Sequence, residues 1–271
     1  MVTVEKYISA FVRIVPQRAA KLRLLTARKE IIDSKILRDG TLDSRTAREL
    51  LIILGDEKTS ESIRGALWKI QKSLSFFLSK RGRLIDQIYE ESNKISNKRG
   101  ANNEDIGMRY YSDMINLRGN VESIVSQLLP LIDKLCYTYK SEAGIIARYT
   151  EQQVPNNAYV GTYNKLLQEE KGQSAAVKNS SKMIIQFQRN LQGFIAKMLN
   201  SENTEVLTGI AVSVVGLTLF ASILALPSMM YGIEVVKDAT PLIPKLLGLA
   251  GGTIGSMTSL STFCKFLGES I

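Results

Sequence analysis

Apolar side chains recur in steps of three and four along most of the chain, which is the spacing of one face of an α-helix. In the N-terminal part this spacing predicts an amphipathic helix over residues 4–38, ended by an Asp-Gly pair. A shorter helix, capped by Asp43 or Ser44, is expected to follow and to end at Gly55. Residues 1–55 are therefore interpreted as a unit of basic amphipathic helices.

Three further stretches carry apolar seams at heptad spacing, as expected for the body of a helical bundle. The first predicts one continuous helix over residues 59–98, followed by a turn of composition Asn-Lys-Arg-Gly-Ala-Asn-Asn. The second seam covers residues 106–149, and the third covers residues 177–198. Because proline removes a helical hydrogen bond, we expect Pro16 to kink its helix and Pro130 to bend or interrupt the second seam.

The predicted fold class is all-α. No alternating strand pattern bounded by turn signals occurs in the sequence. Long amphipathic helices joined by short turns fold back on one another, because each apolar stripe must be removed from water. We therefore expect a long antiparallel helical bundle, or coiled-coil body, over residues 56–204. A C-terminal hydrophobic helical hairpin is expected over residues 205–271.

The C-terminal part contains two apolar runs without a charged residue. The first, Val206–Ile233, has 28 residues, which exceeds the about 20 needed to cross the hydrocarbon core of a bilayer. The second, Leu246–Cys264, contains two GxxxG pairs, a spacing that lets helices approach closely in lipid. The residues predicted to insert into a membrane are Val206, Leu207, Val214, Val215, Leu217, Phe220, Ile223, Leu226, Leu246, Leu247 and Leu249. The residues predicted to pack the helices are Gly248, Gly251, Gly252 and Gly255.

A helix that is apolar on every side must be buried, either in a bilayer or in protein. One interpretation is that the two runs span a membrane, with the basic body on the cytoplasmic side by the positive-inside rule. The other is that they form core helices of a soluble form, which inserts when it is triggered. The sequence leaves both open.

Charge is distributed unevenly between body and hairpin. The chain has a formal net charge of +9, and residues 1–204 carry 32 basic and 22 acidic side chains. Such a body suits an anionic membrane surface. Nucleic acid is a weaker hypothesis, because the hairpin is apolar. The residues predicted to bind an anionic surface are Arg13, Arg18, Lys21, Arg23, Arg28 and Lys29. Residues 1–29 also have the composition of a targeting segment, but their helical spacing favours a retained helix.

The chain contains no histidine, which excludes Ser-His-Asp and Cys-His catalysis and the common zinc and di-iron motifs. The two cysteines, Cys136 and Cys264, form no CxxC motif. We predict no catalytic, cofactor-binding or metal-binding residue, and therefore no enzyme.

The main functional hypothesis from sequence is a membrane-associated helical scaffold or tether. It would act through helix–helix association, as a homo-oligomer or with a helical protein partner. The alternative is an α-helical pore-forming or membrane-permeabilising protein whose hairpin inserts and oligomerises.

Overall fold

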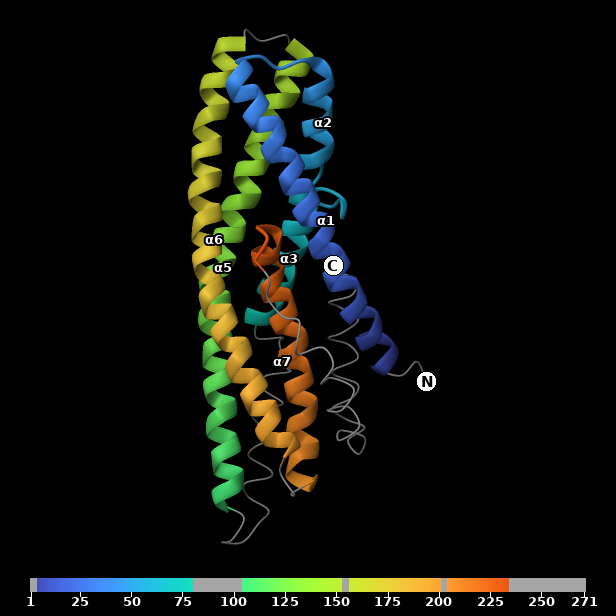
Figure 1. The fold of residues 1–271 in the computed structure, drawn as a ribbon, viewed down its shortest axis with the longest axis vertical. Helices are drawn as coiled ribbons and strands as arrows, with labels where there is room; N and C mark the ends of the chain where they lie inside the picture. Colours follow the sequence, from blue (N-terminus) through green and yellow to red (C-terminus); the bar gives the residue numbers. More distant parts are fainter. Residues whose placement is uncertain (1–3, 80–103, 153–155, 201–203, 234–271) are drawn as a thin grey trace.

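The computed structural model describes residues 4–79, 104–152, 156–200 and 204–233. All regular elements in these ranges are helices, which confirms the all-α class. They form an elongated bundle in which α5 and α6 run side by side (Figure 1). The elements are α1 (Val4–Asp39), α2 (Ser44–Leu54), α3 (Ile63–Leu78), α5 (Glu104–Gln152), α6 (Asn156–Leu199) and α7 (Thr204–Met230).

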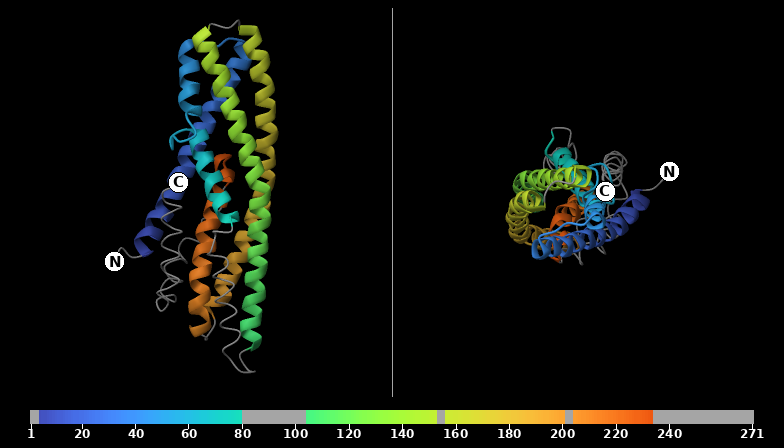
Figure 2. Two further views of the ribbon diagram at one scale, coloured as in Figure 1. Left: turned by 180° about the vertical axis from the view of Figure 1, so that it is seen from behind. Right: turned by 90° about the horizontal axis from the view of Figure 1, so that it is seen from above.

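Helix α7 lies inside the bundle. It contacts α1, α3 and α6, and the view along the long axis places it within the ring formed by the other helices (Figure 2). Between Val214 and Met230 nearly every side chain is buried, polar Thr218 and Ser228 included. The first apolar run of the sequence is thus packed as a core helix of the bundle. The second apolar run lies outside the described residues.

The first two helices have the ends that the sequence predicts. The chain turns after α1 at Gly40, whose φ of +62° is a left-handed conformation that glycine adopts without a Cβ penalty. Asp43 caps α2 by accepting a hydrogen bond from the Thr46 N–H at 2.7 Å. Gly55, at φ +52°, ends α2.

The predicted continuous helix over residues 59–98 is wrong at its start and in its interior. Helix α3 begins only after Ser62, whose hydroxyl accepts a hydrogen bond from the Gly65 N–H at 2.9 Å. It ends at Leu78, because Ser79 takes an extended backbone with ψ of 147°. The Ser79 hydroxyl donates to the Phe76 carbonyl at 2.7 Å, a local hydrogen bond that competes with helix continuation. The rest of the predicted helix lies outside the described residues.

Proline does not interrupt either of the helices that contain it. Helix α1 continues through Pro16, and α5 continues through Pro130. Of the two outcomes expected at Pro130, a bend or an interruption, the interruption does not occur. Buried Leu128 and Ile132 flank Pro130 on the core side of α5. Tertiary packing on both sides of the proline can compensate for the single backbone hydrogen bond that it removes.

The predicted seams form the core. Phe77 of α3 stacks on Phe220 of α7 with ring centroids 4.0 Å apart, so the first seam packs directly on the enclosed helix. The buried positions of the first and third seams are Ile63, Leu67, Ile70, Leu74 and Phe77, and Val177, Ser181, Ile184, Phe187, Leu191, Phe194 and Met198.

Gly65 should be intolerant of a side chain, because a Cβ there would lie 1.5 Å from the Thr59 carbonyl oxygen. We expect Gly65→Ala to lower the free energy of unfolding by about 3 kcal/mol or more, since this clash is with backbone. The matched control is Gly119→Ala, where a Cβ meets nothing within 4 Å. Gly119→Ala should raise the free energy of unfolding by about 0.5–1 kcal/mol, because alanine is favoured over glycine inside a helix. Urea unfolding followed by circular dichroism measures both, and equal effects would contradict the packing of the α3 N-terminus.

Candidate functional site

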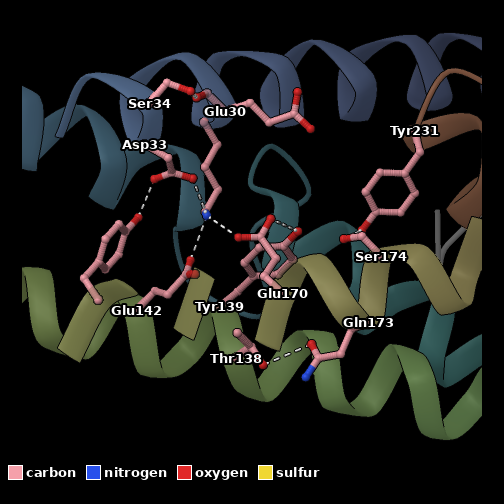
Figure 3. A network of polar contacts seen from close by, with 12 residues as sticks. Glu30, Asp33, Ser34, Thr138, Tyr139, Glu142, Glu170, Gln173, Ser174 and Tyr231 are labelled. Carbon is pink, nitrogen blue, oxygen red and sulfur yellow. Dashed lines mark hydrogen bonds and ion pairs between the residues drawn. The ribbon is translucent and has the colours of Figure 1, made fainter. Parts of the chain in front are cut away.

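A buried lysine joins three helices of the bundle. Lys29 of α1 has a side chain that is only 1% exposed. Its ammonium nitrogen, Nζ, lies 2.8 Å from Asp33 Oδ2 on the same helix, 3.0 Å from Glu142 Oε2 on α5 and 2.6 Å from Glu170 Oε2 on α6. Figure 3 shows these carboxylates converging on one point between the helices. We call Lys29, Asp33, Glu142 and Glu170 the ionic cluster.

Two tyrosines complete the hydrogen bonding of the ionic cluster. The Tyr163 hydroxyl donates to Asp33 Oδ1 at 2.6 Å, and the Tyr139 hydroxyl donates to Glu170 Oε1 at 3.1 Å. Both tyrosines are fully buried, and Lys29 Nζ lies 5.4 Å from the Tyr139 ring centroid and 5.9 Å from that of Tyr163. A cation at this distance from an aromatic face is stabilised by the ring, so the tyrosines support the charge as well as the carboxylates.

Hydroxyl–hydroxyl contacts next to the ionic cluster join the C-terminal end of α7 to α6. The Ser174 hydroxyl of α6 lies 2.9 Å from the hydroxyl of Tyr231, the residue that follows α7 (Figure 3). About two helical turns further along α6, the Ser181 hydroxyl donates to the Ser228 hydroxyl of α7 at 2.9 Å. Helix α7 is therefore attached to α6 at its C-terminal end, close to the point where Glu170 of α6 meets Lys29.

Burial and mutual charge set the protonation of the ionic cluster. Burial acts to lower the pKa of Lys29, but Glu142, Glu170 and Asp33 together outweigh it and raise that pKa above its ordinary value. Burial raises the pKa of Glu142 to about 8, against the opposing effect of Lys29. Burial also raises the pKa of Asp33 above its ordinary value. The carboxylates therefore favour the charged lysine, and burial favours protonation of Glu142.

Glu142 is the least satisfied member of the ionic cluster. Its side chain is completely buried, and neither of its oxygens accepts a hydrogen bond from the described residues. The 3.0 Å contact with Lys29 Nζ is an ion pair without hydrogen-bond geometry. Ionisation of Glu142 would place a further negative charge in an interior where one ammonium already faces two other carboxylates. The ionic cluster can therefore act as a clamp between α1, α5 and α6 that weakens when Glu142 loses its proton.

The placement of Lys29 corrects the sequence interpretation. It was expected on an anionic-binding surface, but it lies in the interior because its ammonium has three carboxylate partners there. The other predicted basic residues lie nearer the surface: Arg13, Arg23 and Arg28 are exposed, Arg28 pairs with Glu49, and Lys21 pairs with Glu61. Arg18 is half-buried.

The residues predicted to insert into a membrane fall into two groups. Val214, Val215, Leu217, Phe220, Ile223 and Leu226 are buried in α7. The side chains of Val206 and Leu207 are not described, and Leu246, Leu247, Leu249, Gly248, Gly251, Gly252 and Gly255 lie outside the described residues.

Sequence reasoning missed the ionic cluster, although heptad spacing carries a signal for it. Lys29 lies seven residues from Leu22 and from Ile36, both of which are buried. Glu142 and Glu170 occupy equivalent seam positions, seven residues after Leu135 and Tyr163. Charged residues at core positions of separate helices must find partners of opposite charge, and this requirement pairs them across the bundle.

Chemically, the site is suited to holding helices together. Within the described ranges, no group of Cys, Asp or Glu side chains is arranged to hold a metal ion. The ammonium of Lys29 fills the space between the carboxylates that a cation would need.

The raised pKa of Glu142 predicts that the bundle loses stability as pH rises. The carboxyl binds a proton on folding between its ordinary pKa of 4.5 and its folded value of about 8. The free energy of unfolding should therefore fall across this range, by up to about 1.4 kcal/mol per pH unit for one proton. Glu142→Gln, which mimics the protonated side chain, should flatten this dependence and be more stable than the unmodified protein at pH 9.

Urea unfolding midpoints measured from pH 5 to pH 9 check this expectation. The matched control is Glu169→Gln, the exposed neighbour of Glu170, which should keep the slope of the unmodified protein. An unchanged slope in Glu142→Gln would show that Glu142 does not hold the proton.

Comparison of the chain with protein-family models, curated proteins and solved structures gave no match. Of the helices that the described residues form, none has a stretch both long and apolar enough to cross a membrane. The features of the described residues that bear on function are the packing of α7 and the ionic cluster.

Proposed function

We propose that this protein is a membrane-permeabilising helical protein, which stores α7 inside its bundle and inserts it into a lipid bilayer when the bundle opens. The observation that carries the proposal is the burial of nearly all α7 side chains from Val214 to Met230, on a helix that contacts α1, α3 and α6. A helix without a polar face has two stable environments, a protein core and a bilayer. The bundle supplies the first, and a membrane would supply the second.

The composition of the apolar run supports entry into lipid. Val206–Ile233 has 28 residues without a charge. Because none of the described helices is long and apolar enough to cross a membrane, the proposal is that α7 enters the apolar phase of a bilayer, not that α7 alone spans it. Exposing the apolar side chains of α7 to water is unfavourable by about 25 cal/mol for each Å². Helix α7 therefore leaves the bundle only when another apolar phase receives it, which makes contact with a bilayer part of the transition.

The ionic cluster supports a bundle that opens. Helix α1 covers α7 on one side and is joined to α5 and α6 through Lys29. Replacing a buried ion pair with apolar side chains is often neutral or stabilising, so such a cluster adds little to net stability. The ionic cluster does make the attachment of α1 to α5 and α6 depend on whether Glu142 is protonated. Loss of the Glu142 proton would loosen the helix that covers α7.

Several predictions from the sequence belong to this proposal. The exposed Arg13 and Arg23 would meet anionic lipid, which attracts basic residues near its surface. Gly248, Gly251, Gly252 and Gly255 would pack the inserted hairpins into an oligomer. The soluble form that inserts on triggering is the localisation proposed, and the basic body would stay on the side from which it inserts.

A fluorescent probe on α7 tests insertion. The probe is attached at Ser222→Cys, a half-buried position on α7, after Cys136 and Cys264 are changed to serine. We expect its fluorescence to be quenched by nitroxide-labelled acyl chains when anionic vesicles are added, together with release of a trapped dye. Release should increase from pH 6 to pH 9 and be reduced at pH 9 in Glu142→Gln.

The matched control carries the probe at Ser126→Cys, an exposed position on α5, and should not be quenched by acyl-chain nitroxides. Absence of quenching at Ser222→Cys and of dye release, at every pH and lipid composition, would rule out insertion of α7.

A scaffold or tether acting through helix–helix association is the second candidate. It is favoured by large apolar side chains that α1 and α2 expose to solvent, namely Leu24 at 62%, Ile31 at 70% and Ile52 at 76%. Where such side chains form a contiguous patch, the patch marks a surface for protein association. If they mediate self-association, Ile31→Lys and Ile52→Lys should shift the sedimentation coefficient of the full chain to that of a monomer. Ser34→Lys, at an exposed polar position, is the control. A monomer in the unmodified protein would contradict this candidate.

A further inference from the structure

A small cleft with about 30 Å³ of internal space, partly open to solvent, lies where α1 and α3 meet the C-terminal half of α7. Its floor is apolar and includes Leu22 of α1 and Leu226 of α7. Its rim is basic, with Arg18 and Lys21 from α1 and Lys69 from α3. Ser60 and Ser62, from the turn before α3, also line it. We call this feature the basic cleft.

The positive charges of the basic cleft are poorly neutralised. In the part of the chain that the structure describes, no carboxylate pairs with Arg18 or Lys69, and only Lys21 has such a partner, Glu61 at 3.1 Å. Arg18 donates one hydrogen bond, from Nη1 to the Ser60 carbonyl at 3.3 Å, and keeps further N–H groups for a ligand. Burial and the nearby Arg18 guanidinium lower the pKa of Lys69. Two like charges are therefore held close together without an anion between them.

We propose that the basic cleft binds a phosphate group, carried either by the head group of an anionic lipid or by a free phosphate monoester. An anion between Arg18 and Lys69 would replace their repulsion with two charge-assisted contacts. A guanidinium and an ammonium are the side chains that most often bind phosphate, the first through paired N–H donors and the second as a point charge. Around the charges, the half-buried Leu25 and Ala66 offer an apolar surface to the part of the ligand that follows the phosphate.

The position of the basic cleft links a bound phosphate to α7. Leu226 belongs to the helix proposed to insert, and Arg18 belongs to the helix that covers it. A lipid head group bound there would bring the covering helix and the stored helix to the membrane surface together. The site itself does not depend on the proposed function, whereas this consequence of it does.

Isothermal titration of the full-length protein with inorganic phosphate and with water-soluble dihexanoyl phosphatidic acid tests the site. Flotation with phosphatidylcholine vesicles, with and without phosphatidic acid, is the membrane arm. We expect Lys69→Gln and Arg18→Gln each to weaken binding by about tenfold or more, the loss of one charge-assisted contact. The matched control is Lys72→Gln on the same helix, which should bind normally. Its Nζ lies 3.9 Å from the Trp68 ring centroid, and it does not line the cleft.

The arms distinguish the two sources of phosphate. Binding of inorganic phosphate equal to that of the soluble lipid, with no vesicle flotation, supports the site with a free phosphate as its ligand. Tighter binding of the lipid, and flotation that requires phosphatidic acid, supports a head group. Absence of saturable binding to every probe overturns the proposal. An equal loss of phosphate affinity in Lys72→Gln also overturns it, because the binding would then come from the overall positive charge of the surface and not from the cleft. Intact phosphate binding without quenching of the α7 probe would refute the proposed function alone.

Discussion

Helix α7 has no polar face, and the arrangement of the other helices follows from this constraint. A helix of this kind cannot form an outer layer of a protein in water, because at least one apolar side would remain exposed. In this bundle α1, α3 and α6 contact it, and Phe77 stacks directly on Phe220. The amphipathic stripes of the surrounding helices therefore face both each other and α7. The proposed function rests on the same property, because a helix without a polar face can be buried either in protein or in a bilayer.

The ionic cluster stands in contrast to this apolar interior. Lys29, Glu142 and Glu170 occupy seam positions on α1, α5 and α6, where aliphatic side chains would pack without any desolvation cost. We expect these charges to make the stability of the bundle sensitive to the protonation of Glu142, whose pKa is raised by burial. A core built only from apolar contacts would have no such dependence. The hydroxyl contact between Ser174 and Tyr231 and the basic cleft lie on the surfaces between α7 and its neighbours, and the ionic cluster joins α1, which contacts α7, to α5 and α6.

Much of this fold could be predicted from sequence, because the signals that define helix ends are local. The Asp43 cap and the turns at Gly40 and Gly55 each depend on a few neighbouring residues. The end of α3 at Ser79 could not be predicted, because the apolar seam continues past it in the sequence. The role of Lys29 was missed for a different reason. It lies in a basic stretch, and only the carboxylates of helices more than a hundred residues away reveal that it is buried.

The departure of α7 from the bundle at a membrane, as we propose it, changes the distance between α6 and α7. Electron–electron double resonance between spin labels at Asn179→Cys on α6 and Ser222→Cys on α7 measures this distance directly, in a chain whose two native cysteines are replaced by serine. We expect a single short distance in water, which gives way to longer distances when the protein is bound to anionic vesicles. An unchanged distance distribution in vesicle-bound protein would contradict it, because α7 would then remain packed on α6 at the membrane.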